Sequence, residues 1–177
     1  MFIQVQPVID YTVRKLCCSP YPRHDKGRNI GCPNFNHKEG CPPKAPLFDK
    51  VFNLNEPVYA ILNKFDLDAH VQKMKAGHPN WSDAQLRSCL LWQGRARKQL
   101  AKQVSEFILT HPQYDVSMSY YRGIEKELGP LYGKIITASP EAMGVNVTKT
   151  LADAGIILEW PPIKVAYQVA LAGMKLC

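Results

Sequence analysis

Apolar residues are grouped along the chain in a few segments whose spacing predicts strands and helices. Residues 57–67 open with a nearly continuous apolar run, which is typical of an interior strand covered on both faces. A second run at 165–172 predicts another strand of the same kind. Shorter patterns at 114–121 and 156–160 predict two more. We therefore expect a sheet of about four strands.

One long helix is predicted between the strands expected at residues 57–67 and 114–121. Leucine, valine and phenylalanine recur at helical spacing through residues 83–110, and Asn80 or Ser82 can cap the first turn. Cys89 falls among these apolar positions, so we expect it to behave as a small apolar residue. Shorter helical segments are predicted at residues 7–16, 68–75 and 139–154. Gly123, Gly129, Pro130 and Gly133 predict a loop at residues 123–133.

These elements predict a mixed α/β (α+β) fold in a single domain, residues 1–177. A chain of 177 residues that is 46% hydrophobic can build one proper core. The core is expected within residues 55–177, with a cysteine-rich loop before it at residues 17–43. The start of the chain lacks the pattern of a signal peptide, and no apolar run reaches the length of a membrane span, so a cytoplasmic protein is expected.

The loop at residues 17–43 carries the most informative chemistry. It holds four of the six cysteines, Cys17, Cys18, Cys32 and Cys41, but almost no aliphatic residues with which to build a core. Thiolates bind iron–sulfur clusters, and Cys32 and Cys41 are each followed by proline, as ligating cysteines often are. Cys17 or Cys18 would supply a third thiolate for a [4Fe-4S] cluster, or both would supply a third and a fourth.

Two other interpretations of the loop are open. His24 or His37 could complete a tetrahedral zinc site with the cysteines, because thiolate and imidazole both suit zinc. The cysteines could also be ordinary thiols on a surface loop. Their spacing matches no standard zinc-finger or ferredoxin pattern, so it does not identify the metal.

The formal charge of +7 favours anionic partners. Cations are concentrated around the cysteines, and Arg23, Lys26 and Arg28 lie inside the loop. They would either offset the negative charge of a thiolate-bound cluster or bind an anion such as a nucleotide, tRNA or another nucleic acid. The sequence predicts no membrane partner and gives no oligomeric state.

Short motifs in three places resemble a family of small, uncharacterised prokaryotic proteins described as predicted metal-binding proteins. They are the turns Gly31-Cys32-Pro33 and Gly40-Cys41-Pro42-Pro43, the strand and long helix that follow, and the segment from Ala138 through Ser139-Pro140-Glu141-Ala142 to Pro161-Pro162. The resemblance implies a metal site built from the N-terminal cysteines. The family also carries a second group of cysteines before the Ser-Pro-Glu-Ala segment, and this chain has none between residues 114 and 175.

Two functions from different classes follow. The first is an iron–sulfur protein that acts in sulfur transfer, desulfuration or redox chemistry on an anionic nucleotide or tRNA. The second is a zinc-stapled protein that binds nucleic acid or serves as an adaptor without catalysis. The chain has no glycine-rich phosphate loop, nucleophile elbow or His-Glu-x-x-His motif, so the sequence does not decide whether the protein is an enzyme.

Overall fold

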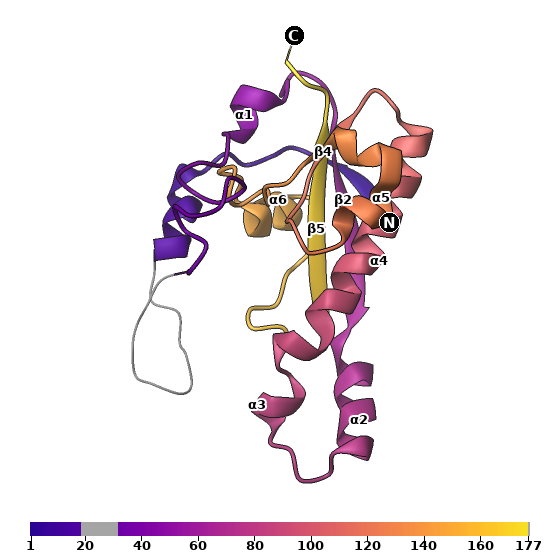
Figure 1. The fold of residues 1–177 in the computed structure, drawn as a ribbon. Helices are drawn as coiled ribbons and strands as arrows, with labels where there is room; N and C mark the ends of the chain where they lie inside the picture. The colour runs from indigo at the N-terminus through magenta and orange to yellow at the C-terminus, as the bar shows by residue number, and fades with distance from the viewer. Residues whose placement is uncertain (19–31, 177) are drawn as a thin grey trace.

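A computed structural model describes residues 1–18 and 32–176 of the chain (Figure 1). This part of the chain forms one sheet of five strands, in the order β1-β2-β5-β3-β4. The strands are β1 (Phe2–Val5), β2 (Val58–Asp66), β3 (Asp115–Ser117), β4 (Ile135–Ile136) and β5 (Val165–Gly173). Only the β3–β4 pair is parallel among these strands. The mixed α/β class is therefore confirmed, with five strands in place of the four expected.

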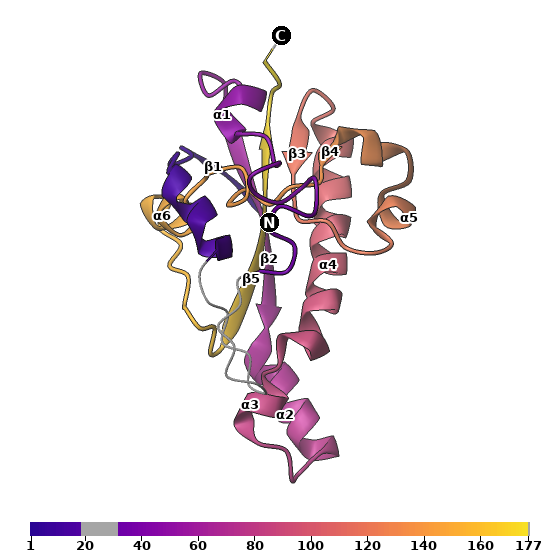
Figure 2. The same ribbon diagram turned by 60° about the vertical axis from the view of Figure 1, so that its left-hand side comes forward.

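Helices and 3-10 helices connect these strands. They are η1 (Tyr11–Cys18), α1 (Phe48–Val51), α2 (Leu67–Gly77), α3 (Asp83–Leu86), α4 (Cys89–Thr110), α5 (Ile124–Leu128), η2 (Gly129–Lys134) and α6 (Val147–Asp153). Helix α4 runs along one side of the sheet with α5 beside it, whereas η1, α1 and α6 lie on the other side (Figure 2). The sheet is therefore the middle layer between two groups of helices.

The long strands β2 and β5 are neighbours in the interior of the sheet, and each contributes residues to the hydrophobic clusters on both faces. Alternate residues of β2 point to opposite sides, so Ile61 packs in the cluster formed with α4, whereas Leu62 packs in the cluster on the opposite face. Asn63, which is also buried, donates from Nδ2 to the backbone oxygen of Ala96 in α4 at 2.9 Å. This hydrogen bond satisfies a buried polar group and attaches α4 to the sheet.

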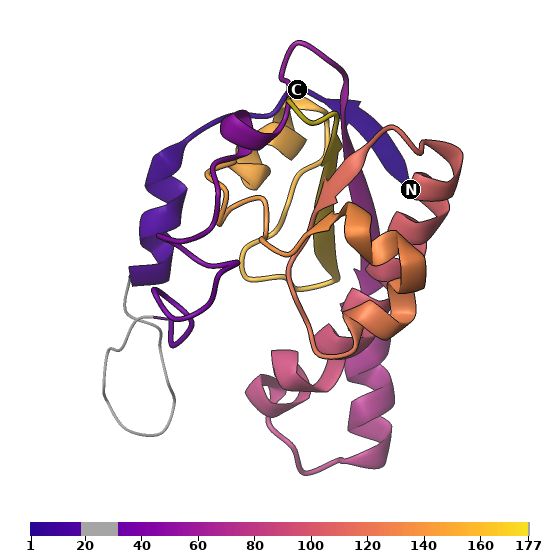
Figure 3. The same cartoon turned by 45° about the horizontal axis from the view of Figure 1, so that its top comes forward.

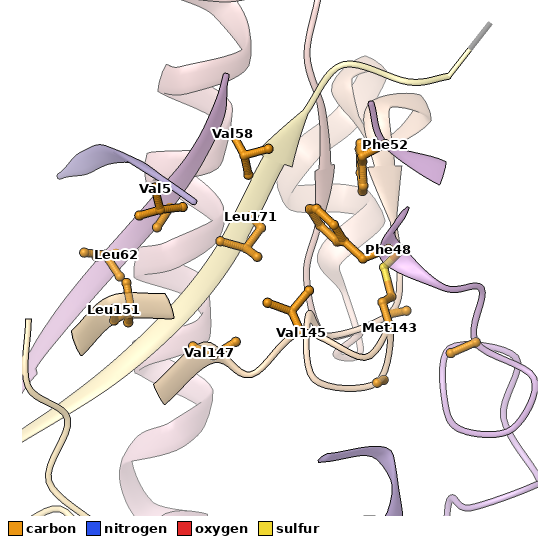
Figure 4. Close-up of a cluster of buried hydrophobic side chains, with 14 residues drawn as sticks. Val5, Phe48, Phe52, Val58, Leu62, Met143, Val145, Val147, Leu151 and Leu171 are labelled. Carbon is orange, nitrogen blue, oxygen red and sulfur yellow. The ribbon is translucent and has the colours of Figure 1, made fainter. Parts of the chain in front are cut away.

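The second hydrophobic cluster attaches α1 and residues 138–151 to the sheet. Its strand residues include Val58, Leu62 and Leu171, which face side chains from α1, from residues 143–147 and from α6 (Figure 4). Phe48 and Phe52, at the two ends of α1, are completely buried, with ring centroids 4.5 Å apart. The segments beside the cysteines are thus fixed to the sheet by packing.

The predicted helix over residues 83–110 is interrupted. Ser82 caps α3 through a capping box with Gln85, and the chain leaves the helix before α4 begins at Cys89. Leu90 is 90% exposed and Cys89 is also exposed, so the expectation that both belong to an apolar, core-facing side was wrong at this end of the helix. The break turns the first residues of α4 away from the core.

Other predictions for the second half of the chain also need correction. Residues 156–160 form no strand, and the helix expected from Ser139 begins only at Val147, after a series of turns. The segment around residues 123–133, interpreted as a loop, contains α5 and η2. No helix among residues 1–18 and 32–176 combines the length and the apolar character needed to cross a membrane.

Candidate metal centre

The first 3-10 helix, η1, carries Cys17 and Cys18 at its C-terminal end, as the sequence predicts. Two side chains fix it to the segment that follows the cysteine loop. Tyr11 donates its hydroxyl to Oδ2 of Asp49 at 2.7 Å. Arg14 donates from Nη2 to the backbone oxygens of Pro43 and Ala45, at 2.9 and 3.0 Å. The helix is therefore attached just downstream of Cys41.

The turn at residues 139–145 supports η1 from the other side. The backbone N–H of Asp10 donates to the oxygen of Gly144 at 2.8 Å, and Ile9 forms an isolated bridge with Val145. Gly144 has a φ of +90°, and a Cβ placed there would lie 2.6 Å from the Tyr11 ring. Glycine is therefore required both by the backbone conformation and by the close packing of Tyr11.

The turn that carries Cys41 is pressed against the end of β4. A Cβ added to Gly40 would lie 1.9 Å from the carbonyl oxygen of Thr137, so the two backbones are in contact. The backbone N–H of Cys41 donates to Lys38 at 3.0 Å, and its oxygen accepts from Ala45 at 2.9 Å. Residue 41 therefore has a defined position relative to the sheet.

Cys32 returns to the end of η1. Its backbone N–H donates to the carbonyl oxygen of Cys17 at 2.9 Å, across a separation of 15 residues. Burial raises the pKa of the Cys17 thiol, and the charges of Cys32, Cys41 and Cys18 raise it further. The backbone of Cys32 therefore lies beside that of Cys17, although the two residues are 15 positions apart in the sequence.

The surroundings of the thiols differ. Cys17, Cys32 and Cys41 are partly buried, whereas Cys18 is exposed. Burial and the neighbouring Cys32 raise the pKa of Cys41, and the positive charge of Lys38 lowers it. A cation is therefore close enough to Cys41 to favour its thiolate, the form that binds metals.

Glu141 is a candidate residue that the sequence did not single out. Its charge is one of the causes, after burial and the neighbouring cysteines, that raise the pKa of Cys17. Burial also raises the pKa of Glu141 itself, against the opposing effect of hydrogen bonds that include one from Ser139. A carboxylate can ligate metals. Glu141 lies about 100 residues from the cysteines in the sequence, so the sequence alone did not connect it with them. The only sequence signal is its position in the Ser139-Pro140-Glu141-Ala142 motif.

The structure describes only one of the remaining predicted site residues. His37 is exposed on the turn before Cys41. His24, Arg23, Lys26 and Arg28 lie outside the described residues. In residues 1–18 and 32–176, no three side chains of His, Cys, Asp or Glu are arranged so that they could hold a metal ion, and no cysteine there forms a disulfide.

The chemistry of the thiols nevertheless fits a soft metal or an iron–sulfur cluster. Cys17, Cys32 and Cys41 are partly buried, and they lie on segments held by hydrogen bonds and close backbone packing. Sulfur ligands select zinc, copper(I) and iron–sulfur clusters over magnesium or calcium. The raised pKa of Cys17 and of Cys41 means that metal binding must displace protons from these thiols, as it does at other thiolate sites.

The fold and these residues define a mixed α/β protein with a thiol-bearing site beside its sheet. The chain belongs to the predicted metal-binding protein family DUF2284, whose model matches residues 22–176. The matched region includes Cys32, Cys41 and Glu141, and it begins after Cys17 and Cys18. The comparisons with curated proteins and with solved structures gave no match.

Proposed function

We propose that this protein binds a [4Fe-4S] cluster through Cys17, Cys32 and Cys41. The observation that supports it is the hydrogen bond from the backbone N–H of Cys32 to the carbonyl oxygen of Cys17, at 2.9 Å. The charge of Cys41 also acts on the pKa of Cys17. Membership of a predicted metal-binding family supports a metal cofactor in general terms. The specific choice of iron and sulfide rests on the thiol-rich donor set and on the prolines after Cys32 and Cys41.

Cys18 has a different role in this proposal. It is exposed, whereas the other three cysteines are partly buried, so we assign the cluster to three thiolates and leave Cys18 beside it. Three-thiolate ligation leaves one iron of a cubane cluster able to act as a Lewis acid or to accept sulfide. Such a centre suits sulfur transfer or desulfuration, whereas ligation by Cys18 as well would suit electron transfer.

The proposed substrate is an anion, a nucleotide or a tRNA. The net charge of +7 and the basic residues near the cysteines in the sequence support an anionic partner. Arg23, Lys26 and Arg28 are the cations that we propose to contact the anion, because they lie between Cys18 and Cys32 in the sequence. The substrate would then be bound next to the proposed cluster.

Single cysteine substitutions test the ligand set. Cys17→Ser, Cys32→Ser and Cys41→Ser should each remove most of the iron and sulfide from protein purified without oxygen. Cys89→Ser is the matched control, because Cys89 is an exposed thiol on α4, and its iron content should equal that of the wild type. Equal loss of iron in all four variants, or in none, would contradict the assignment.

Two further variants separate the alternatives. Cys18→Ser should keep its iron if three thiolates bind the cluster, and should lose it if four do. His37→Ala should have no effect on an iron–sulfur centre. Release of zinc by His37→Ala, from a protein that contains zinc and no iron, would instead support the zinc-stapled nucleic-acid-binding or adaptor protein.

A further inference from the structure

A second candidate site lies away from the cysteines, where β2 ends and the chain turns into α2. A cleft of about 420 Å³ is present there. It is lined by Lys64, Phe65 and Asp66 of β2, Ala69, His70 and Lys73 of α2, and Arg95 and Gln99 of α4. Figures 1 and 3 show α2 extending from the end of β2, on a different side of the protein from η1. The candidate metal centre contributes no residue to this cleft.

The charges around the cleft are unbalanced. Lys64, Lys73 and Arg95 come from three different elements and are all exposed. None of the three has an ion pair or a side-chain hydrogen bond within residues 1–18 and 32–176. The carboxylate that lines the cleft, Asp66, is already engaged as the cap of α2, where it accepts from the N–H of Ala69 at 2.8 Å. The cleft is therefore a concentration of positive charge.

His70 shows that these cations act on the interior of the cleft. Its ring packs near that of Phe65, with centroids 5.8 Å apart, and its Nε2 is buried without a hydrogen-bond partner. Burial lowers the pKa of His70, and the charges of Arg95 and Lys73 lower it further. A negative ligand in the cleft would offset these two charges and favour the protonated ring.

Neutral donors are available as well. Gln99 accepts a hydrogen bond at its Oε1 from Asn63, at 3.3 Å, which leaves its amide NH₂ to donate. Phe65, 6% exposed, supplies an apolar wall. A cleft of this volume is within the range of small-molecule sites and exceeds the needs of a single inorganic anion. It therefore has room for an organic group in addition to the charged one.

We propose that this cleft binds a phosphomonoester, with its dianionic phosphate among Lys64, Lys73 and Arg95. Lysine and arginine are the side chains that bind phosphate in proteins, and arginine can do so with two parallel hydrogen bonds. The dianion would balance most of the unpaired charge of the cleft. This site does not depend on the candidate metal centre, so it can be tested whatever the metal content of the protein.

The test measures binding of inorganic phosphate and of AMP by calorimetry and by NMR of the His70 ring. Wild-type protein should bind AMP more tightly than phosphate, and either ligand should raise the pKa of His70. The variant Lys64→Ala/Lys73→Ala/Arg95→Ala should bind AMP at least about tenfold more weakly, because it removes all three cationic partners of the phosphate. The milder Arg95→Gln should weaken AMP binding in the same direction.

The control removes the same charge from positions outside the cleft. Lys75, Lys102 and Lys126 are exposed lysines on α2, α4 and α5, and none has a side-chain partner within the part of the chain that the structure describes. The variant Lys75→Ala/Lys102→Ala/Lys126→Ala should bind AMP as the wild type does. Equal weakening in both triple variants would show that only net charge matters and would overturn the site, as would the absence of any effect of phosphate on His70.

A competition experiment tests whether the phosphate belongs to a small molecule or to the end of a nucleic acid. RNA oligonucleotides with and without a 5′-phosphate are compared as competitors of AMP. Competition by neither RNA supports a small phosphorylated molecule, and competition by the 5′-phosphorylated RNA alone supports the same phosphate chemistry at a nucleic-acid end. Equal competition by both RNAs would overturn the phosphomonoester proposal, because it would indicate general attraction to the backbone.

Discussion

Substitution of Gly40 by alanine should destabilise the protein and reduce its metal content together. The added Cβ would lie 1.9 Å from the carbonyl oxygen of Thr137 and 3.0 Å from the carbonyl carbon, whereas heavy atoms in real proteins essentially never approach a Cβ within 3.0 Å. Both neighbours are backbone atoms, so the turn before Cys41 must move by about 1 Å or more. Overpacking of this kind costs about 1–3 kcal/mol.

The expected change can be measured by thermal unfolding followed by circular dichroism. At roughly 2–4 °C per kcal/mol for a protein of this size, the Gly40→Ala variant should unfold about 2–12 °C below the wild type. Gly94→Ala is the control: Gly94 is exposed within α4, its Cβ would meet nothing within 4 Å, and alanine should stabilise this helix by about 0.8–1 kcal/mol. An unchanged midpoint and metal content for Gly40→Ala would refute the close approach and its role in placing Cys41.

Three other substitutions test the charges of the structure. Asp115→Asn should lower the free energy of unfolding by about 1.5–3 kcal/mol in urea, because the buried carboxylate pairs with two lysines; an effect below about 0.5 kcal/mol would contradict this. Burial lowers the pKa of His70 in the folded protein, so the neutral ring stabilises the fold, and this stabilisation is lost as the pH falls below the unfolded pKa of about 6.5. The His70→Gln variant should therefore lose less stability than the wild type between about pH 7 and 5. An equal loss in both proteins would contradict this effect of His70. In metal-free protein, Glu141→Gln should speed alkylation of Cys17 at mildly alkaline pH by removing a charge that raises the pKa of this thiol, whereas the rate at Cys89 should stay the same. Unchanged alkylation of Cys17 would separate Glu141 from the site.

The sheet is the part of the fold that the sequence predicted best. Strand β2 begins with an apolar run from Val58 to Leu62 that is largely buried on both faces, and β5 is also mostly apolar, so both strands have a clear pattern. Residues 156–160 show the opposite case. Ile156 and Leu158 are partly buried against the core while Ile157 is 73% exposed, an alternation that resembles a strand although the segment pairs with no strand of the described chain. The alternation of apolar and polar residues in a segment indicates which of its side chains are buried. Whether the segment pairs as a strand depends on residues far away in the sequence.

Glycines misled the prediction for the segment before β4. Gly123 and Gly129 both have positive φ, and they stand immediately before and after α5. Glycine in this conformation often bounds a helix, so the residues interpreted as a loop were the two ends of a short helix. The two-residue strand β4 is too short to leave a periodic pattern of its own.

The sequence singled out the candidate cysteines but not the residues around them. It named Cys17, Cys18, Cys32 and Cys41 as candidate ligands, and the structure places the backbone of Cys32 beside that of Cys17. The contribution of Glu141 and the close approach of Gly40 to Thr137 depend on contacts between segments about 100 residues apart. Such contacts leave no periodic signal in a single sequence. The sequence could therefore name the cysteines as candidates, whereas the residues packed around them could be identified only from the fold.

The most direct test of the proposed cluster is a visible absorption spectrum of the protein purified without oxygen, with iron, sulfide and zinc measured on the same sample. A [4Fe-4S] cluster should give a brown protein with broad visible absorption from thiolate-to-iron charge transfer, and with about four irons and four sulfides per chain. The absorption should disappear in Cys32→Ser and persist in Cys89→Ser. A colourless protein that contains about one zinc per chain and no sulfide would contradict the cluster.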